Sequence, residues 1–264
     1  RATDTVNGRS ATATVTLVVR SVNVAPVVDA GANKTVNEGQ SVSFSGSKTD
    51  PGANQTWTYT WSWGDGTANT TGTLTPTHTF AQQGTYTVRL TVRDNGGLEG
   101  TDTLTVTVNN VAPTITSPTT TQRNINEGSA LDLTITFSDP GNDTYTVTVT
   151  WASGVTSTVS VAAGAGTKTA TTSRVYTNQG THAASVAVSD GTTTTTVSFN
   201  VVVANVAPTV TNPGNKTITE GTTQSITASY SDPGTDSTTV TFNWGDTTST
   251  QVTKAAAAGS QSAS

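Results

Sequence analysis

Short stretches in which apolar and polar residues alternate recur along the whole chain, each bounded by Gly, Pro, Asn or Asp. Between residues 23 and 109 they cover residues 41–44, 57–63, 85–92 and 103–108. A period of two places every second side chain on the same face, which predicts β-strands with one buried face. Many short strands separated by turn residues predict an all-β fold of the sandwich type.

Three sequence markers repeat in the same order, which predicts one domain per repeat. Asn-Val-Ala-Pro begins at Asn23, Asn110 and Asn205. A Glu-Gly pair then precedes an Asp-Pro-Gly triplet by twelve residues in every repeat, at Glu38 and Asp50, Glu127 and Asp139, and Glu220 and Asp232. The alternating run beyond each triplet ends in tryptophan, at Trp63, Trp151 and Trp244. The repeats therefore share one strand register.

These markers divide the chain into a linear array of segments. Residues 23–109 and 110–204 are the two predicted domains, and residues 1–22 form the closing strand of a preceding one. Residues 205–264 supply only the opening strands of a further domain. We expect this domain to expose an apolar interior unless further residues, or a strand donated by another chain, complete it. The chain contains no methionine and no signal peptide, so we expect an interior stretch of a longer protein.

The first domain resembles the PKD domain family. The resemblance rests on Trp61-Ser62-Trp63-Gly64-Asp65-Gly66, His78-Thr79-Phe80, Gly84-Thr85-Tyr86-Thr87-Val88 and Val92-Arg93-Asp94. Residues 110–204 resemble a divergent copy, because Trp151-Ala152-Ser153-Gly154 lacks the loop Asp and His182 replaces the tyrosine. The resemblance implies immunoglobulin-like sandwiches of cell-surface or secreted proteins, which space, bind or stack rather than catalyse. It names no ligand.

Composition and charge exclude several classes of function. The net charge is −5 and the twelve Lys and Arg residues are scattered, so no basic surface for nucleic acid is expected. No apolar stretch approaches the roughly 20 residues of a membrane-spanning helix. Cysteine is absent and the two histidines occupy non-equivalent places, which argues against thiolate metal sites and histidine-based catalysis. We expect no enzyme activity, and the composition by itself identifies no cofactor.

The Asp-Pro-Gly triplets have two interpretations. As a plain turn, Pro fixes φ at the first central position and Gly accepts positive φ at the next. As a calcium joint, the triplet and its neighbouring acids supply the oxygen ligands that Ca²⁺ prefers. In a seven-stranded sandwich, the loops that carry these acids meet the incoming linker at one pole, facing the Glu-Gly turn of the domain before. The expected clusters are Glu38, Asn110, Asp139, Asp143 and Asp190, and Glu127, Asn205, Asp232 and Asp236.

The aromatic strand at residues 57–63 also has two interpretations. Trp57, Tyr59, Trp61 and Trp63 share one face, which could form a platform for stacking sugars. The equivalent positions in the other repeats carry apolar residues, including Tyr145, Val147, Val149 and Trp151, which favours a buried core. Trp57 is not matched by a tryptophan in the other repeats and is the best candidate for an exposed ligand contact.

Two main hypotheses of function follow. The first is a structural or adhesive extracellular array that serves as stalk, filament or surface-layer material, in contact with neighbouring repeats and with other copies of itself. The second is an accessory module of a large secreted hydrolase that grips polysaccharide or protein fibres, with a glycan or matrix component as partner. A decoration domain on a virus particle is a third alternative.

Overall fold

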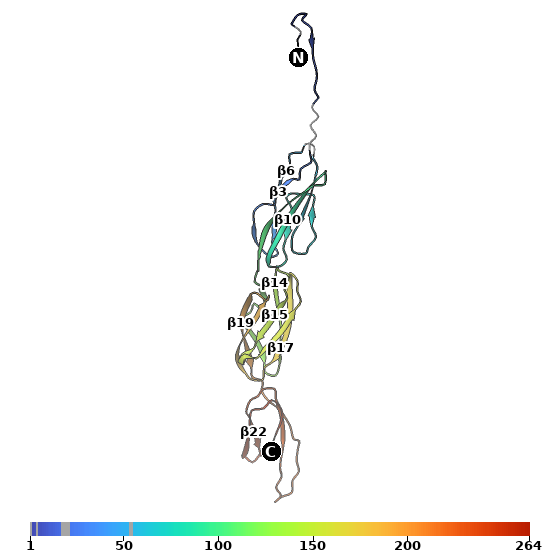
Figure 1. Cartoon of the computed structure of the whole chain (residues 1–264). Helices are drawn as coiled ribbons and strands as arrows, with labels where there is room; N and C mark the ends of the chain where they lie inside the picture. The colour runs from blue at the N-terminus through green and yellow to red at the C-terminus, as the bar shows by residue number, and fades with distance from the viewer. Residues whose placement is uncertain (1, 4, 17–21, 53–54) are drawn as a thin grey trace. The chain divides into compact units, whose positions relative to one another are not determined.

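The computed structural model describes residues 2–3, 5–16, 22–52 and 55–264, and these residues form strands and turns (Figure 1). The all-β prediction is confirmed, as is the tandem arrangement of immunoglobulin-like sandwiches. Within these ranges the helical structure is limited to one 3-10 turn, η1 (Ala152–Gly154), far too short to cross a membrane.

The backbone contacts divide the chain into two compact units. The first unit comprises Arg1–Val36, Ser41–Thr79 and Thr85–Thr107, and the second comprises Asn37–Gln40, Phe80–Gly84 and Val108–Ser264. The change at residues 107–108 lies close to the predicted boundary between 109 and 110. The turn 37–40, which the repeat pattern assigns to the first domain, belongs by its contacts to the second unit.

The first unit contains one larger sheet and two strand pairs. The larger sheet has the order β4 (Lys34–Asn37), β11 (Glu99–Asn109), β10 (Gly84–Asp94), β7 (Trp57–Ser62) and β8 (Thr70–Thr71). The pairs are β3 (Val27–Asp29) with β6 (Ser47–Thr49), and β5 (Ser41–Ser43) with β9 (Thr77–Thr79). The predicted strands 41–44, 57–63, 85–92 and 103–108 all lie on these elements, which confirms the alternation pattern.

The aromatic strand β7 points into the core rather than to solvent. Trp61 and Trp63 are fully buried, and Phe44 lies between them with ring centroids 5.4 and 4.9 Å away. Trp57 is half-buried, and the Lys48 ammonium lies over its ring, 3.0 Å from the centroid. A cation therefore covers one face of the Trp57 ring, and the role of Trp57 as a ligand contact stays a prediction.

A complete sandwich occupies residues 110–204 of the second unit. One sheet has the order β12 (Thr114–Ser117), β14 (Ala130–Asp139) and β17 (Gly166–Val175). The other has the order β13 (Gln122–Asn126), β19 (Thr194–Ala204), β18 (Gly180–Ser189), β15 (Tyr145–Thr150) and β16 (Thr156–Val161). The strand β13 pairs parallel with β19, and the other pairs are antiparallel. The core packs alternating residues of both sheets around Trp151 and Phe137.

Residues 205–264 form a smaller part of the same unit. Here β21 (Ala228–Asp232) lies between β20 (Thr209–Thr211) and β24 (Gly259–Ala263), and β22 (Thr238–Asn243) pairs with β23 (Ser249–Lys254). An apolar hollow of about 360 Å³ includes Val210, Tyr230, Phe242 and Trp244 in its lining. Trp244 is 47% exposed although Trp63 and Trp151, at the equivalent repeat positions, are buried, because few apolar side chains are present here to cover it.

The predicted closing strand at residues 1–22 is not continuous in the described part of the chain. The described residues form a short hairpin, in which β1 (Ala2–Thr3) pairs with β2 (Ser10–Ala11). Residues 12–16 carry no strand. Residues 1, 4 and 17–21 lie outside the described ranges, so this part of the domain assignment stays a prediction.

The two tryptophans at equivalent repeat positions should respond differently to truncation. Trp151→Ala removes a fully buried side chain, and we expect a loss of about 3–5 kcal/mol from the free energy of unfolding of the second sandwich. Trp244→Ala, the matched control, should cost about 1 kcal/mol or less. Hydrogen exchange in the whole chain measures the loss at Trp151 on peptides from β14 to β19 and the loss at Trp244 on peptides from β20 to β24. Equal losses of protection would contradict the different burial of the two positions.

Candidate metal sites in the second unit

A tight turn presents Glu38 to the interior of the second unit. The N–H of Glu38 donates to the Asn109 carbonyl at 3.0 Å, and the N–H of Gly39 donates to the Phe80 carbonyl at 2.9 Å. Gly39 has φ +72°, a left-handed conformation that favours glycine. An added Cβ at this position would lie 2.7 Å from Pro140, so glycine also permits the close approach of the two loops.

The Asp-Pro-Gly loop lies directly against this turn. The Gly141 N–H donates to Asp139 Oδ1 at 2.7 Å, which closes the turn. The expectation of positive φ at the glycine is wrong, since Gly141 is not in the left-handed region. Its role is spatial, because a Cβ there would lie 2.5 Å from Asp143 Oδ2 and 2.8 Å from Glu38 Oε1. Any larger residue would displace the carboxylates.

Three carboxylates converge at this point. Glu38, Asp139 and Asp143 are 0%, 2% and 7% exposed, and each places a carboxylate oxygen within 4.8 Å of the others. Glu38 accepts hydrogen bonds from the N–H groups of Val111 at 2.8 Å and Gln83 at 3.0 Å. The Oδ2 atoms of Asp139 and Asp143 are buried and have no hydrogen-bond partner. The cluster therefore holds buried negative charge that the described protein groups leave partly uncompensated.

The pKa values of the cluster reflect this crowding. Burial raises the pKa of Glu38, and the hydrogen bond from the Val111 N–H lowers it by less. The charges of Asp143 and Asp139 raise it further. Burial also raises the pKa of Asp139 and of Asp143, and the charge of Asp190 adds to both. Beneath the cluster, burial and the charges of Asp139 and Asp143 raise the pKa of Tyr145 to about 12. Each cause is a penalty on negative charge in a confined space.

Asp190 and Asn110 lie beside the three carboxylates rather than among them. The Asn110 amide donates to Asp190 Oδ2 at 2.9 Å and to Thr193 Oγ1 at 3.0 Å. Asp190 also accepts hydrogen bonds from the N–H groups of Thr192 and Thr193. Burial opposes ionisation of Asp190, but these bonds prevail and hold its pKa below the usual range. The Oδ1 atom of Asn110 is buried without a partner, so the amide offers one further oxygen.

The same arrangement recurs one repeat later. The carboxylate oxygens of Glu127, Asp232 and Asp236 lie within 4.8 Å of one another, and Glu127 Oε1 accepts the Val206 N–H at 2.7 Å. The Gly234 N–H closes the loop by donating to Asp232 Oδ1 at 2.8 Å. A polar hollow of about 390 Å³ lies at this cluster, with Gln179, Asn205, Asp232 and Asp236 in its lining. The backbone bonds Glu127 N–H to Ala204 and Gly128 N–H to Tyr176 match those of Glu38 and Gly39.

The Asn205 amide lies against the second cluster. Its nitrogen donates to Asp236 Oδ2 at 2.8 Å and to Glu127 Oε1 at 2.9 Å. These two bonds link the residue after the second domain to both carboxylates.

The structure brings together acids that the sequence pattern placed in the same clusters, and it adds two contributors that the pattern missed. The Gln83 N–H supports Glu38 as a backbone donor, and a backbone group leaves no residue-type signal. Tyr145 donates its hydroxyl to the carbonyl oxygens of Gly141 at 3.2 Å and Gly164 at 3.1 Å, which steadies the loop. In the sequence, Tyr145 stands two residues after Asp143 at the start of an alternating run, and the pattern of that run predicted only a buried core position.

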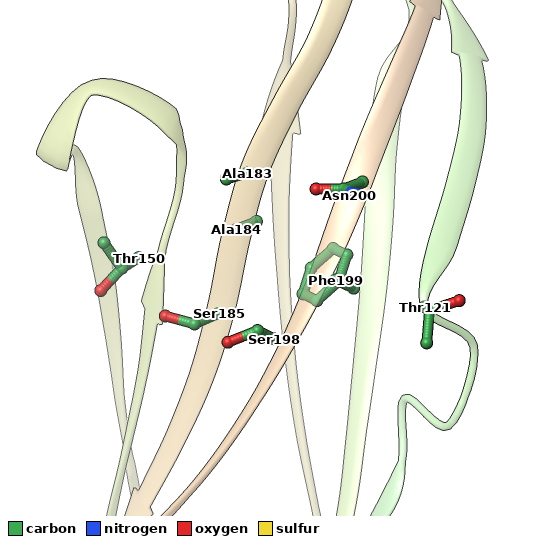
Figure 2. Close-up of a pocket in the computed structure, with 8 residues that line it drawn as sticks. All are labelled: Thr121, Thr150, Ala183, Ala184, Ser185, Ser198, Phe199 and Asn200. Carbon is green, nitrogen blue, oxygen red and sulfur yellow. The ribbon is translucent and has the colours of Figure 1, made fainter.

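A second kind of feature covers the outer face of the sheet that contains β15 and β18. Opposed residues on four neighbouring strands form rows of hydroxyl side chains, of which one row is Thr156, Thr150, Ser185 and Ser198. An open hollow of about 430 Å³ continues from this row, and Figure 2 shows Thr150, Ser185 and Ser198 beside Thr121 and Asn200. The lining contains no charged residue, so the hollow offers neutral hydrogen-bonding groups.

Comparisons with known proteins agree with the architecture of the first repeat. Residues 23–108 match the sequence profile of the PKD domain family. No curated protein sequence matches the chain. PKD domains are typical of extracellular and cell-surface proteins.

Several solved structures of tandem domains are similar to the chain. The fibronectin(III)-like modules of Clostridium thermocellum CbhA are 18% identical, with 67% of this chain and 93% of that chain covered and a TM-score of 0.27. A tandem of titin immunoglobulin domains is 13% identical, with 70% and 99% covered and a TM-score of 0.31. Drosophila N-cadherin is 14% identical, with 70% and 69% covered and a TM-score of 0.29. Residues 23–108 are a PKD domain, and further immunoglobulin-like β-sandwich structure follows it in tandem.

Proposed function

We propose that the chain is a non-catalytic structural segment of an extracellular repeat array, used as stalk, filament or surface layer, in which calcium fastens each Glu-Gly turn to the next repeat. The observation that carries the proposal is the convergence of Glu38, Asp139 and Asp143, three buried carboxylates with oxygens within 4.8 Å of one another. The same convergence at Glu127, Asp232 and Asp236 supports a role of the repeat itself.

The chemistry of the donors favours a hard divalent cation. Three carboxylates carry up to three negative charges, and burying them without compensation is costly. Ca²⁺ takes six to eight oxygen ligands with flexible geometry, and carboxylates together with amide oxygens provide them. The buried, partnerless oxygens of Asp139, Asp143 and Asn110 are available for this purpose. The ligand set contains neither Cys nor His, which disfavours zinc.

The amide orientation at the second site gives the proposal a structural readout. With a cation bound, Asn205 would turn its oxygen toward Glu127 and Asp236, and without it the nitrogen would donate to both. Asn110 differs, since its nitrogen already donates to Asp190 and Thr193 and only its oxygen is free. The first site is therefore organised in advance, whereas the second requires a rotation of Asn205.

A second candidate function is that of an accessory binding module, supported by the neutral hollow in Figure 2. Hydroxyl and amide groups of Ser185, Ser198 and Asn200 could hydrogen-bond a sugar chain or a protein fibre. Sugar sites usually add an aromatic stacking surface, and Phe199 at this hollow is only 4% exposed. The array is therefore the better-supported function.

Calcium should stabilise the second unit through the first cluster. Extracellular calcium modules bind with Kd of about 0.1–1 mM, so about 10 mM calcium should add about 1.4–2.7 kcal/mol per site. Calorimetry of the whole chain, with calcium and with chelator, measures this as a rise in Tm. Asp139→Asn should remove the rise attributable to the first site, and Asp132→Asn, an exposed carboxylate on the same strand, should leave it unchanged. An unchanged wild-type Tm would refute the calcium joint.

Without calcium, acidification from pH 7 toward about 5 should raise the stability of the second unit. The folded-state pKa values of Glu38, Asp139 and Asp143 are raised, so the folded state binds more protons than the unfolded state in this window. The carboxylates with lowered pKa values, such as Asp190, change the stability of the second unit only below about pH 4. With calcium the trend should reverse, because protons displace the cation. If the Tm of the chain in chelator falls between pH 7 and pH 5, the raised pKa values are contradicted.

A further inference from the structure

The strands β13 and β19 form a parallel ladder in the sandwich of residues 110–204. Five residue pairs join the two strands, the last of them Asn126 with Ala204. A further hydrogen bond lies at each end of the ladder. At its start the Asn200 N–H donates to the Thr121 carbonyl at 2.8 Å, and at its end the Glu127 N–H donates to the Ala204 carbonyl at 3.0 Å. The ladder therefore extends along the whole of β13 and finishes at Glu127.

The chain enters and leaves this sandwich at opposite ends of β19. At the entry, Asn110 donates to the hydroxyl of Thr193, which directly precedes β19. At the exit, Asn205 directly follows the last residue of β19. Because β13 runs in the same direction as β19, tension along the chain draws β13 toward the entry and β19 toward the exit. The evenly spaced bonds of a parallel ladder are then strained together rather than opened one after another.

The end of the ladder coincides with the second carboxylate cluster. The backbone of Glu127 makes the last bond of the ladder, and its side chain, 2% exposed, joins Asp232 and Asp236. Glu127 Oε1 accepts the Val206 N–H, whereas Oε2 is buried without a hydrogen-bond partner. The loop of Gly234 lies against this carboxylate, since a Cβ there would lie 2.5 Å from Oε2. One residue thus belongs to the ladder and to the cluster.

Sliding of β13 along β19 would remove Glu127 from the cluster. A strand advances ~3.3 Å per residue, and a slip by one residue also turns its side chains to the opposite face. Ca²⁺ holds its oxygen ligands at about 2.3–2.6 Å, so a slip of this size would break the bond between a cation and the Glu127 carboxylate. A bound cation must therefore release Glu127 before the ladder can move.

We propose that the cation at Glu127, Asp232 and Asp236 locks the β13–β19 ladder against tension along the chain. The lock rests on the proposed function for its cation, and it assigns that site a mechanical task. With calcium bound, the sandwich of residues 110–204 withstands tension, and without calcium it opens at a lower force. The aspartates of one repeat thereby control the strength of the repeat before it.

The preceding repeat ends its ladder in the same way. The strand β4 lies beside β11, and Glu38, the residue after β4, donates its N–H to the carbonyl of Asn109 at the end of β11 at 3.0 Å. The side chain of Glu38 is fully buried with Asp139 and Asp143. The connection between the last bond of a ladder and a carboxylate cluster is thus a property of the repeat.

Stretching the sandwich between two introduced cysteines tests the lock. The chain contains no cysteine, so Ala112→Cys and Ala207→Cys, at equivalent exposed alanines on either side of the sandwich, provide the only attachment points in the whole chain. Magnetic tweezers at constant force then measure the rates of opening and refolding. About 10 mM calcium should lower the opening rate about 10- to 100-fold relative to chelator. The refolding rate should not change, because the lock forms only in the completed register.

Two further substitutions in this background locate the effect. Asp236→Asn removes one carboxylate from the lock and leaves the ladder intact, so in calcium this variant should open about as fast as the parent chain in chelator. Asp132→Asn, at an exposed carboxylate on β14, is the matched control and should respond to calcium like the parent. Slowing by calcium that is equally large in Asp236→Asn would overturn the lock.

The Tm of the same chains separates failure of the lock from failure of the proposed function. A Tm that rises with calcium while the opening rate stays at its value in chelator would overturn the lock and leave the calcium joint standing. A Tm and an opening rate that both ignore calcium would refute the calcium joint and the lock together. Calcium that speeds refolding without slowing opening would also overturn the lock, because the cluster would then form before the ladder.

Discussion

The burial of Glu38 and Glu127 is the constraint on which the second unit depends. Glu38 lies with two further buried carboxylates, and Glu127 lies with one buried and one partly buried carboxylate. Backbone donors such as the Val111 N–H recover part of that hydration, and the rest must come from protons or a cation. The turns, the linkers and the Asp-Pro-Gly loops are positioned around this requirement.

The sequence predicted the fold, and it predicted which acids would lie near one another, because both depend on spacing. Alternation set the faces of the strands, and a constant offset of twelve residues between each Glu-Gly pair and its Asp-Pro-Gly triplet placed the acids on loops that a sandwich brings together. The role of Gly141 could not be predicted in this way. Its need for space comes from Glu38, a residue about a hundred positions away, whereas turn statistics consider only neighbours.

The sequence predicted the strand position of each tryptophan better than its burial, above all where few side chains lie nearby. Trp151 and Trp244 occupy the same repeat position, yet only Trp151 is covered, because coverage depends on strands that pack from the opposite sheet. Trp57 was expected to be exposed because no other repeat has a tryptophan there. Lys48, which has no marker in the sequence, covers it instead.

The split origin of each cluster has a consequence for how such genes change. Every cluster takes its glutamate from one repeat and its aspartates from the following one. Unequal recombination that adds or removes whole repeats in register would regenerate complete clusters at every new boundary. A crossover out of register would leave some acids without the residues that complete their cluster, and selection would act against it. The chemistry of the boundary thus favours variation in the number of repeats over variation in their length.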